Sequence, residues 1–308
     1  MTADLCLGLD TSNYTTSAAI FDGHRDCGQN SGKPLTVPEG TKGLRQNEAL
    51  FQHVKSLPQV LSNLELEHTD IRAVGVASKP REEEGSYMPC FLAGVCAGKI
   101  LAQTLRIGYY EFSHQQGHIA SAAWSSGSSH LLDRPHLAWH LSGGTTELLY
   151  VTPMGKSVSC RRIGGSNDIS AGQLIDRTGF HMGMDFPAGK RLDELACKGR
   201  VRDSYKIKLR GTEFSLSGME NKVIEMISKG CEHGEIAVFV FETLADVLIR
   251  ACENAGAEYG PLPILFSGGV SSSIYIRSRI PKGIFPAPEY ATDNALGIAL
   301  LTYRALEE

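Results

Sequence analysis

The chain has 308 residues, 42% hydrophobic and 21% charged, with a formal net charge of −4, so it allows one large or two medium globular domains and carries no overall field that attracts nucleic acid. Its eight cysteines are scattered without a CxxC pair, which favours reduced thiols in a cytoplasmic protein over a disulfide framework or a structural zinc site. No apolar run has the length of a signal peptide or a membrane span, so we expect no membrane association.

The chain opens with an apolar strand, residues 5–10, that ends in Asp10 and leads through a polar turn to a second strand, residues 17–21. The turn, residues 11–16, is rich in hydroxyl groups, which together with its backbone N–H groups can face a phosphate or a metal. Thr11 and Ser12 are therefore candidate ligand-binding residues. An ordinary hydroxyl-rich hairpin is the structural alternative.

Residues 47–64 show helical periodicity despite Pro58, and residues 71–77 form an apolar strand. The charged stretch 78–87, with three glutamates, is typical of a solvated surface loop. Residues 88–105 then predict an apolar helix with small residues on one face.

Two histidines, His114 and His118, follow a strand-like run at residues 107–112. Their spacing of four places both imidazoles on one face of a helix, where a divalent transition metal can bind both. The alternative is that two histidines at a helix start pack or cap it. The third ligand predicted for such a site is Asp293, just before the closing helix, although a residue there is more often a cap.

A second module of strand, turn and strand occupies residues 137–151, and its turn contains Ser142, Gly143, Gly144 and Thr145. Its glycines allow close approach of a ligand to the backbone. Because it repeats the opening module about 130 residues later, we predict an internal duplication that binds phosphate. A plain type I′ hairpin is the alternative.

The region after this module predicts a helix at 167–179, which begins near Asp168 and carries Asp176, and a tight turn at 185–189 that ends in Gly189. The segment 190–210 is rich in lysine and arginine and is the best candidate for binding a polyanion. A solvated surface is the alternative. A long helix at 235–255 and a strand at 262–266 lead to a third glycine turn, Gly268–Gly269, placed before a helix as nucleotide-binding turns are.

Taken together, these motifs resemble the Kae1/TsaD family (formerly "glycoprotease"), within the actin-like, sugar kinase and Hsp70 (ASKHA) superfamily. The motifs that carry the resemblance, in the family's order, are residues 7–12, 113–118, 141–146, 176, 185–189, 214–218, 267–271 and 290–295.

The resemblance implies an α/β fold of two duplicated ASKHA (RNase H-like) domains with a nucleotide cleft between them. We expect an N-terminal domain at 1–129, completed by the C-terminal helix at about 292–308, and a C-terminal domain at 130–291.

The resemblance also implies the chemistry. The metal, iron or zinc with magnesium as an alternative, would be bound by His114, His118 and Asp293. The nucleotide, ATP, ADP or an acyl-adenylate, would by this resemblance contact Ser142, Gly143, Gly144, Asp176, Gly189, Gly268 and Gly269. Thr11, Ser12, Thr145 and Ser273 are further candidate nucleotide-binding residues. The family transfers a threonylcarbamoyl group from threonylcarbamoyl-adenylate to N6 of an adenosine in tRNA. Asp10 is the nearest candidate for a catalytic carboxylate.

The same resemblance implies partners: tRNA, a smaller TsaB-like paralogue and a TsaE-like ATPase, with a homodimer as an open alternative. The chain departs from the family where the family has acids (Tyr14, Thr15, Ile169), a histidine (Thr145) and an asparagine (Ser273). These departures indicate a divergent paralogue. A non-catalytic metal- and nucleotide-binding protein that acts through a partner is the second hypothesis. A metallopeptidase, the old O-sialoglycoprotein endopeptidase label, is disfavoured because HxxxH lacks the glutamate of HExxH.

Overall fold

The structure, a computed structural model, describes residues 5–12, 14–37, 44–66, 71–200 and 205–307. The chain forms two compact units. Unit 1 comprises Met1–Arg134, Thr152–Cys160 and Asp293–Glu308, and unit 2 comprises Pro135–Val151 and Arg161–Thr292.

Unit 1 is built on a five-stranded sheet in the order β3-β2-β1-β4-β5. Its strands are β1 (Leu5–Ser12), β2 (Thr15–Asp22), β3 (Cys27–Pro34), β4 (Ile71–Lys79) and β5 (Gly108–Ser113). The first three strands pair antiparallel, whereas β4 and β5 continue the sheet in parallel from β1. Asp10 and Ser113 therefore both lie near the carboxyl ends of parallel strands, the edge where α/β sheets bind ligands.

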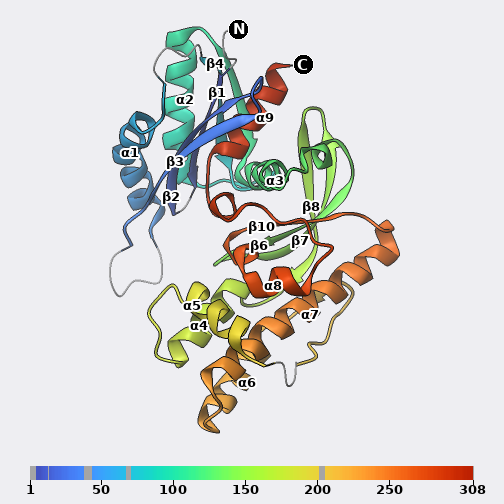
Figure 1. Cartoon of the computed structure of the whole chain (residues 1–308). Helices are drawn as coiled ribbons and strands as arrows, with labels where there is room; N and C mark the ends of the chain where they lie inside the picture. The colour runs from blue at the N-terminus through green and yellow to red at the C-terminus, as the bar shows by residue number, and fades with distance from the viewer. Residues whose placement is uncertain (1–4, 13, 38–43, 67–70, 201–204, 308) are drawn as a thin grey trace. The chain divides into compact units, whose positions relative to one another are not determined.

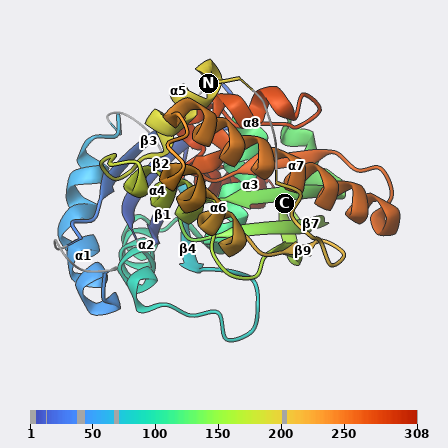
Figure 2. The same cartoon turned by 90° about the horizontal axis from the view of Figure 1, so that it is seen from below.

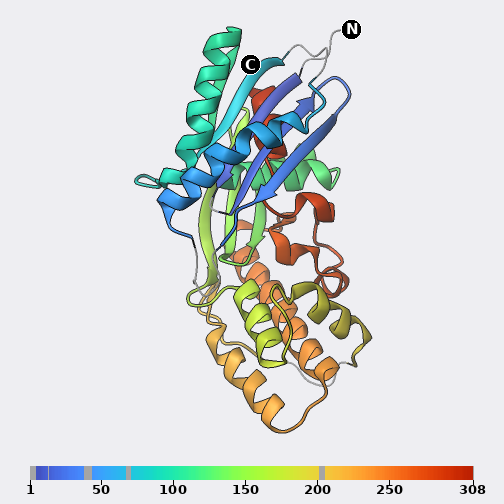
Figure 3. The ribbon, with the colours of Figure 1, turned by 90° about the vertical axis from the view of Figure 1, so that its left-hand side faces the viewer.

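Helices cover both faces of this sheet (Figures 1 and 3). On one face α1 (Gln46–Ser62) packs mainly on β2, and α2 (Leu92–Leu105) packs on β4 and β1, over a cluster of buried apolar residues of the sheet. A short 3₁₀ turn, Pro89–Phe91, precedes α2. On the other face α9 (Leu296–Leu306) lies along β1, β2 and β4, and α3 (His114–Ser125) packs against α9. The apolar, small-residue composition of α9 suits a helix that is buried along most of its length.

Unit 2 contains a second five-stranded sheet, in the order β10-β6-β7-β8-β9. Its strands are β6 (His136–Leu141), β7 (Thr146–Met154), β8 (Ser157–Ser166), β9 (Glu213–Phe214) and β10 (Ile264–Ser267). As in the first sheet, the strands joined by the opening turn, β6 and β7, pair antiparallel, and β10 joins β6 in parallel. The parallel bridge between Leu265 and Ile284 then takes the place that β5 has beside β4. This repeated strand order confirms the predicted duplicated α/β architecture.

The helices of unit 2 are α4 (Ala171–His181), α5 (Gly189–Lys198), α6 (Ser217–Ser228), α7 (His233–Tyr259) and α8 (Ile274–Arg279). Figure 2 shows them in front of the strands. Their buried faces meet fully buried sheet residues such as Trp139 and Phe266 around the central helix α7. No helix among the described residues is long and apolar enough to span a membrane.

Two local features differ from the sequence analysis. No strand was predicted between residues 22 and 46, yet this stretch contains the edge strand β3, whose exposed, glycine-containing sequence has no apolar alternation. The first turn is shorter than expected, since Thr11, Ser12 and Thr15 belong to the strands; Asn13 lies outside the described residues.

Candidate functional site

Helix α3 begins where the sequence predicted it, directly after β5, and its start is fixed by a reciprocal cap. The Ser113 hydroxyl accepts the Gln116 N–H at 3.2 Å, and the Ser113 N–H donates to the Gln116 side-chain oxygen at 2.7 Å. Such a capping box satisfies two of the helix's free N–H groups. It places His114 at the first helical position and His118 one turn further along.

The two histidines and Asp293 come together as predicted, within unit 1. The Nε2 atoms of His114 and His118 are 3.0 Å apart, and the Asp293 Oδ1 atom lies 3.3 Å from that of His118 and 3.7 Å from that of His114. Among the described residues, these three side chains are the group whose donor atoms could hold a metal ion. Ligand atoms about 2.0–2.1 Å from a tetrahedral zinc lie about 3.3 Å from one another, so the donor set fits a metal without rearrangement.

Asp10 lies behind this cluster and contacts it through one histidine. Its Oδ2 atom is 2.6 Å from His114 Nδ1, and its Oδ1 atom accepts the Ser12 N–H at 2.9 Å. Asp10 itself is only 2% exposed. Burial opposes the charged imidazolium, but the Asp10 and Asp293 carboxylates outweigh that effect and raise the pKa of His114 to about 9. A carboxylate on the far ring nitrogen is the arrangement that orients metal-binding histidines.

The position of Asp293 depends on how closely α9 packs on α3. A Cβ atom added at Gly297 would lie 1.8 Å from the carbonyl oxygen of Gly117, which sits between the two histidines. The segment that carries Asp293 is held by further hydrogen bonds: the Ser121 hydroxyl donates to Asn294, and the Ala295 N–H donates to Asn30. Sequence reasoning missed this contact, although small residues in both helices were its signal.

The first hairpin places Thr11 and Ser12 next to Asp10, but only the Thr11 hydroxyl forms hydrogen bonds within the described residues. The Thr11 hydroxyl donates to the Cys90 carbonyl at 3.0 Å and accepts the Gly94 N–H at 3.1 Å, so it ties β1 to the start of α2. The buried Ser12 hydroxyl has no partner among the described residues. Of the three residues that replace family acids, the two in this hairpin differ in exposure: Tyr14 is 47% exposed and Thr15 is half-buried.

His53, a buried residue of α1 that the sequence analysis did not single out, contacts the hairpin at Thr16, the cross-strand partner of Thr11. Its Nδ1 atom is 2.8 Å from the Thr16 hydroxyl oxygen, and burial lowers its pKa to about 4. His53 is therefore neutral near pH 7 and links α1 to the hairpin through its hydrogen bond with Thr16.

In unit 2, the turn at residues 142–145 is closed by its own serine. The Ser142 hydroxyl accepts the N–H groups of Gly144 and Thr145, and the Ser142 N–H donates to the Thr145 carbonyl. A Cβ atom at Gly143 or Gly144 would meet no atom within 4 Å, so both glycines leave open space beside the backbone.

The third glycine turn lies beside this one. Gly268 has a φ of +85°, and a Cβ atom there would lie 2.3 Å from the Leu141 carbonyl oxygen. Only glycine is compatible with both constraints. The structure thus brings the turn at Gly268 and Gly269 next to Ser142, within one unit.

Two other residues predicted to bind the nucleotide, Ser273 and Asp176, form hydrogen bonds within unit 2. The Ser273 hydroxyl donates to Asp193 at 2.5 Å, and the same carboxylate accepts the N–H groups of Ile274 and Tyr275. Asp193, which the sequence analysis did not identify, therefore caps α8. Asp176 accepts the Ala188 N–H at 2.9 Å, which brings it close to Gly189.

The expectation that Asp168 begins the helix carrying Asp176 was wrong. That helix, α4, starts at Ala171 and is capped by Ser170 together with Gln173. Asp168 instead accepts hydrogen bonds from Ser215, Leu216 and Ser217 at the start of α6, and these bonds hold the pKa of its carboxyl well below the usual range despite the opposing effect of burial. Of the predicted basic segment, residues 190–198 lie on α5, and residues 201–204, with Arg202, lie outside the described residues.

Solved structures with the same architecture cover nearly the whole chain. Component A of (R)-2-hydroxyglutaryl-CoA dehydratase from Acidaminococcus fermentans has a TM-score of 0.60 at 16% identity, covering 99% of this chain and 100% of that one. A glucokinase of the ROK family from Streptomyces griseus has a TM-score of 0.52 at 14% identity, covering 97% and 99%. These similarities show that the fold is that of the ASKHA superfamily.

Sequence comparison gives the family. The chain is 28% identical to the tRNA N6-adenosine threonylcarbamoyltransferase of Thermus thermophilus, covering 99% of this chain and 93% of that protein. The protein of the same description from Bacillus licheniformis is also 28% identical, with coverages of 98% and 92%. The family model described as tRNA N6-adenosine threonylcarbamoyltransferase matches residues 44–300. The chain therefore belongs to the TsaD family.

Proposed function

We propose that this protein is a metal-dependent, nucleotide-binding transferase that moves a carbamoyl-type acyl group from an acyl-adenylate to tRNA. The observation that carries the proposal is the cluster of His114, His118 and Asp293, with Asp10 bound to the far side of His114. Its support is the family: relatives that this chain matches over nearly its whole length are described as tRNA N6-adenosine threonylcarbamoyltransferases.

Two imidazole nitrogens and one carboxylate would hold the metal, a donor set that suits zinc or iron and is foreign to magnesium, which prefers oxygen ligands. A divalent metal bound there supplies Lewis acidity toward a phosphate or carbonyl oxygen. Since both oxygens of Asp10 are engaged, we propose that Asp10 orients His114 and holds the proton on its Nδ1 atom, instead of acting as a general base.

The nucleotide phosphates would lie at the paired glycine turns of unit 2. The open space beside Gly143 and Gly144 and the adjacent Gly268 support this placement, because a ligand can approach the backbone closely there. Once the acyl donor is bound, an attacking amine of the acceptor needs little beyond correct positioning.

The proposal is tested by measuring metal content and adenine-nucleotide binding of the wild type and of the double variant His114→Ala/His118→Ala. We expect about one metal per chain in the wild type, and loss of metal with weaker nucleotide binding in the variant. His130→Ala, a change at an exposed histidine, is the matched control and should retain both. Transfer to tRNA is then assayed with the metal-loaded protein.

A second candidate is a non-catalytic binding protein that assembles with a partner. Tyr14 and Thr15, which stand where family members carry acids, favour it. The predicted partners are a smaller TsaB-like paralogue and a TsaE-like ATPase. Acyl transfer by the purified chain alone would contradict this candidate, whereas metal and nucleotide binding without transfer would favour it.

Peptidase activity lacks a supporting observation. Gln115 stands where a HExxH metallopeptidase has its glutamate, and an amide cannot act as a general base. Its backbone N–H donates to the Pro80 carbonyl, which fixes this turn of α3 to the preceding loop.

A further inference from the structure

A pocket of about 490 Å³ opens in unit 2 between α7, α8 and the sheet, and its volume lies within the range of small-molecule sites. This amino-end pocket lies where the parallel strands β6 and β10 begin, with Leu137 and Ile264 among its lining residues. The turns that contain Ser142 and Gly268 follow the carboxyl ends of the same strands. The pocket is therefore separated from them by most of the length of β6, about 13 Å.

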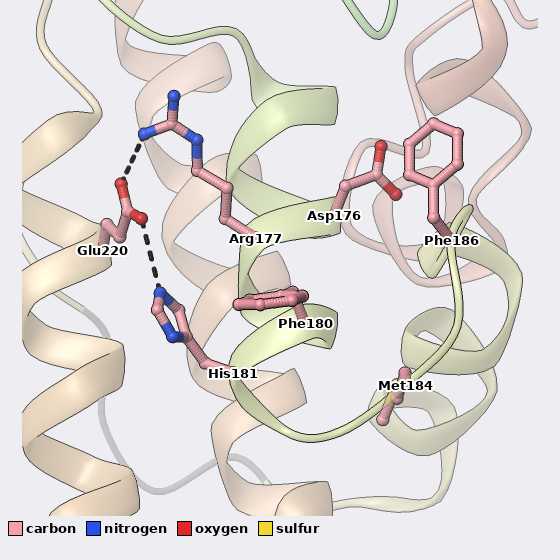
Figure 4. A pocket seen from close by; sticks show the side chains of 7 residues that line it. All are labelled: Asp176, Arg177, Phe180, His181, Met184, Phe186 and Glu220. Atoms are coloured by element: carbon pink, nitrogen blue, oxygen red, sulfur yellow. Dashed lines mark hydrogen bonds and ion pairs between the residues drawn. The ribbon is translucent and has the colours of Figure 1, made fainter. Parts of the chain in front are cut away.

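The hollow drawn in Figure 4 is a different part of unit 2. Asp176 lines that hollow, and the family resemblance assigns this residue to the nucleotide, so the hollow belongs with the proposed nucleotide site. The residues that line the amino-end pocket include none of those assigned to the nucleotide or to the metal. The amino-end pocket therefore requires a ligand of its own.

The floor of the amino-end pocket is apolar and belongs to the core of unit 2. Leu137, Leu248 and Phe266 form it, and each is 1% exposed. One wall is a face of α7, on which Ile249 and Gly256 lie seven residues, or about two turns, apart. A Cβ atom at Gly256 would meet nothing within 4 Å, so this wall leaves open space. The pocket therefore has room for an apolar group and offers it an apolar surface.

A thiol in the same wall narrows the chemistry of the ligand. The Cys252 sulfur accepts the Trp139 indole N–H at 3.1 Å. Burial, with a smaller contribution from the negative charge of Glu253, raises the pKa of this thiol to about 12. A thiol that stays protonated near pH 7 is a poor nucleophile and a poor metal ligand. The pocket is therefore suited to the reversible binding of an organic molecule.

The charged side chains of the pocket fall into two groups. Arg279 is engaged, because it donates to both carboxylate oxygens of Glu242, at 2.6 Å and 2.8 Å. Glu253 on α7 and Lys282 just after α8 also line the pocket and are exposed, and neither forms a hydrogen bond or an ion pair within the described residues. The pocket thus offers one carboxylate and one ammonium group, from different walls, above an apolar floor.

We infer that the amino-end pocket binds a free α-amino acid with a large apolar side chain, such as leucine or phenylalanine. The side chain lies on the apolar floor, the ammonium group pairs with Glu253, and the carboxylate pairs with Lys282. An apolar anion would meet the like charge of Glu253 and an apolar cation that of Lys282, so a zwitterion matches the two charges best. The inference does not rest on the proposed function, because the metal cluster and the glycine turns do not line this pocket.

The first experiment measures by calorimetry the affinity of the whole chain for leucine and for two analogues: isocaproate, which lacks the amino group, and isoamylamine, which lacks the carboxylate. Wild type should bind leucine about threefold or more tightly than either analogue, as expected for exposed ion pairs. In Glu253→Gln the preference over isocaproate should disappear, and in Lys282→Gln the preference over isoamylamine should disappear. Glu258→Gln and Lys198→Gln, which change exposed charges outside the pocket, are the matched controls.

The second experiment fills the pocket. Gly256→Leu places a side chain in the open space of the α7 wall and should abolish the binding of leucine and phenylalanine without lowering the urea midpoint of unfolding. The inference is overturned by a wild type that binds neither amino acid or that binds leucine no better than its analogues, and equally by unchanged binding in Gly256→Leu. Metal content and adenine-nucleotide binding, measured on the same samples, should be the same in all variants, so a failure of the proposed function is recognised separately.

Discussion

The Oδ2 atom of Asp10 lies 2.6 Å from the Nδ1 atom of His114, although the two residues are 104 positions apart in the chain. Asp10 lies near the end of the first strand, and His114 begins the helix after the last strand of the same sheet. The contact fixes the ring of His114 so that its Nε2 atom faces His118 and Asp293. The predicted metal site depends on that orientation.

Replacing Asp10 by asparagine removes the negative charge behind His114 and leaves the shape of the side chain unchanged. We expect the affinity for zinc or ferrous iron to fall about tenfold or more, as for other changes of groups that orient metal-binding histidines. Competition with a chromophoric chelator measures this. Glu84→Gln, an equal charge change in the exposed loop after β4, is the control and should bind metal like the wild type.

Replacing Gly297 by alanine should push α9 away from α3, because the new methyl group would lie 1.8 Å from the Gly117 carbonyl oxygen. We expect a loss of about 1–3 kcal/mol in the free energy of unfolding and a weaker metal site, since α9 follows Asp293. Urea denaturation and metal titration check the two effects. Gly256→Ala in α7, where a Cβ atom meets nothing within 4 Å, should be neutral or stabilising, and equal losses in both variants would contradict the packing argument.

The lowered pKa of His53 predicts how the free energy of unfolding depends on pH. Its pKa is lowered to about 4 in the folded chain and is near the ordinary 6.5 when unfolded, so between these values the unfolded chain binds more protons. The contribution of neutral His53 to the free energy of unfolding should therefore be fully present above about pH 6.5 and should be lost as the pH drops toward 4. Unfolding by urea at pH 7 and pH 4.5 measures the slope, which should be shallower in His53→Gln. An unchanged slope would show that His53 is not buried in its neutral form.

Replacing Asp193 should disturb the structure locally, at the start of α8. Substitution by alanine leaves the Ser273 hydroxyl and the N–H groups of Ile274 and Tyr275 without their acceptor. We expect destabilisation by about 1–3 kcal/mol and faster amide hydrogen exchange in α8. Ser273→Ala, which keeps the Asp193 carboxylate and both N–H bonds, should have the smaller effect.

Much of this fold and of the candidate metal site follows from local patterns. A four-residue spacing on a helix brings His114 next to His118 without any knowledge of tertiary structure. The duplicated strand–turn–strand modules predicted two similar sheets, because each module is a hairpin with its own apolar strands.

What local patterns could not predict is set by distant contacts. The capping role of Asp168 depends on residues about fifty positions later in the chain, and the edge strand β3 forms because β2 offers it a ladder of hydrogen bonds. The predicted domain bounds, 1–129 with 292–308 and 130–291, remain a prediction.

The most direct test of the central claim is metal stoichiometry by titration of metal-free protein with zinc and with ferrous iron, for wild type, His118→Ala and Asp293→Ala. We expect one tight site per chain in the wild type and its loss in both variants, with His130→Ala unaffected. A wild type that binds neither metal, or a His118→Ala variant that binds as tightly as the wild type, would contradict it.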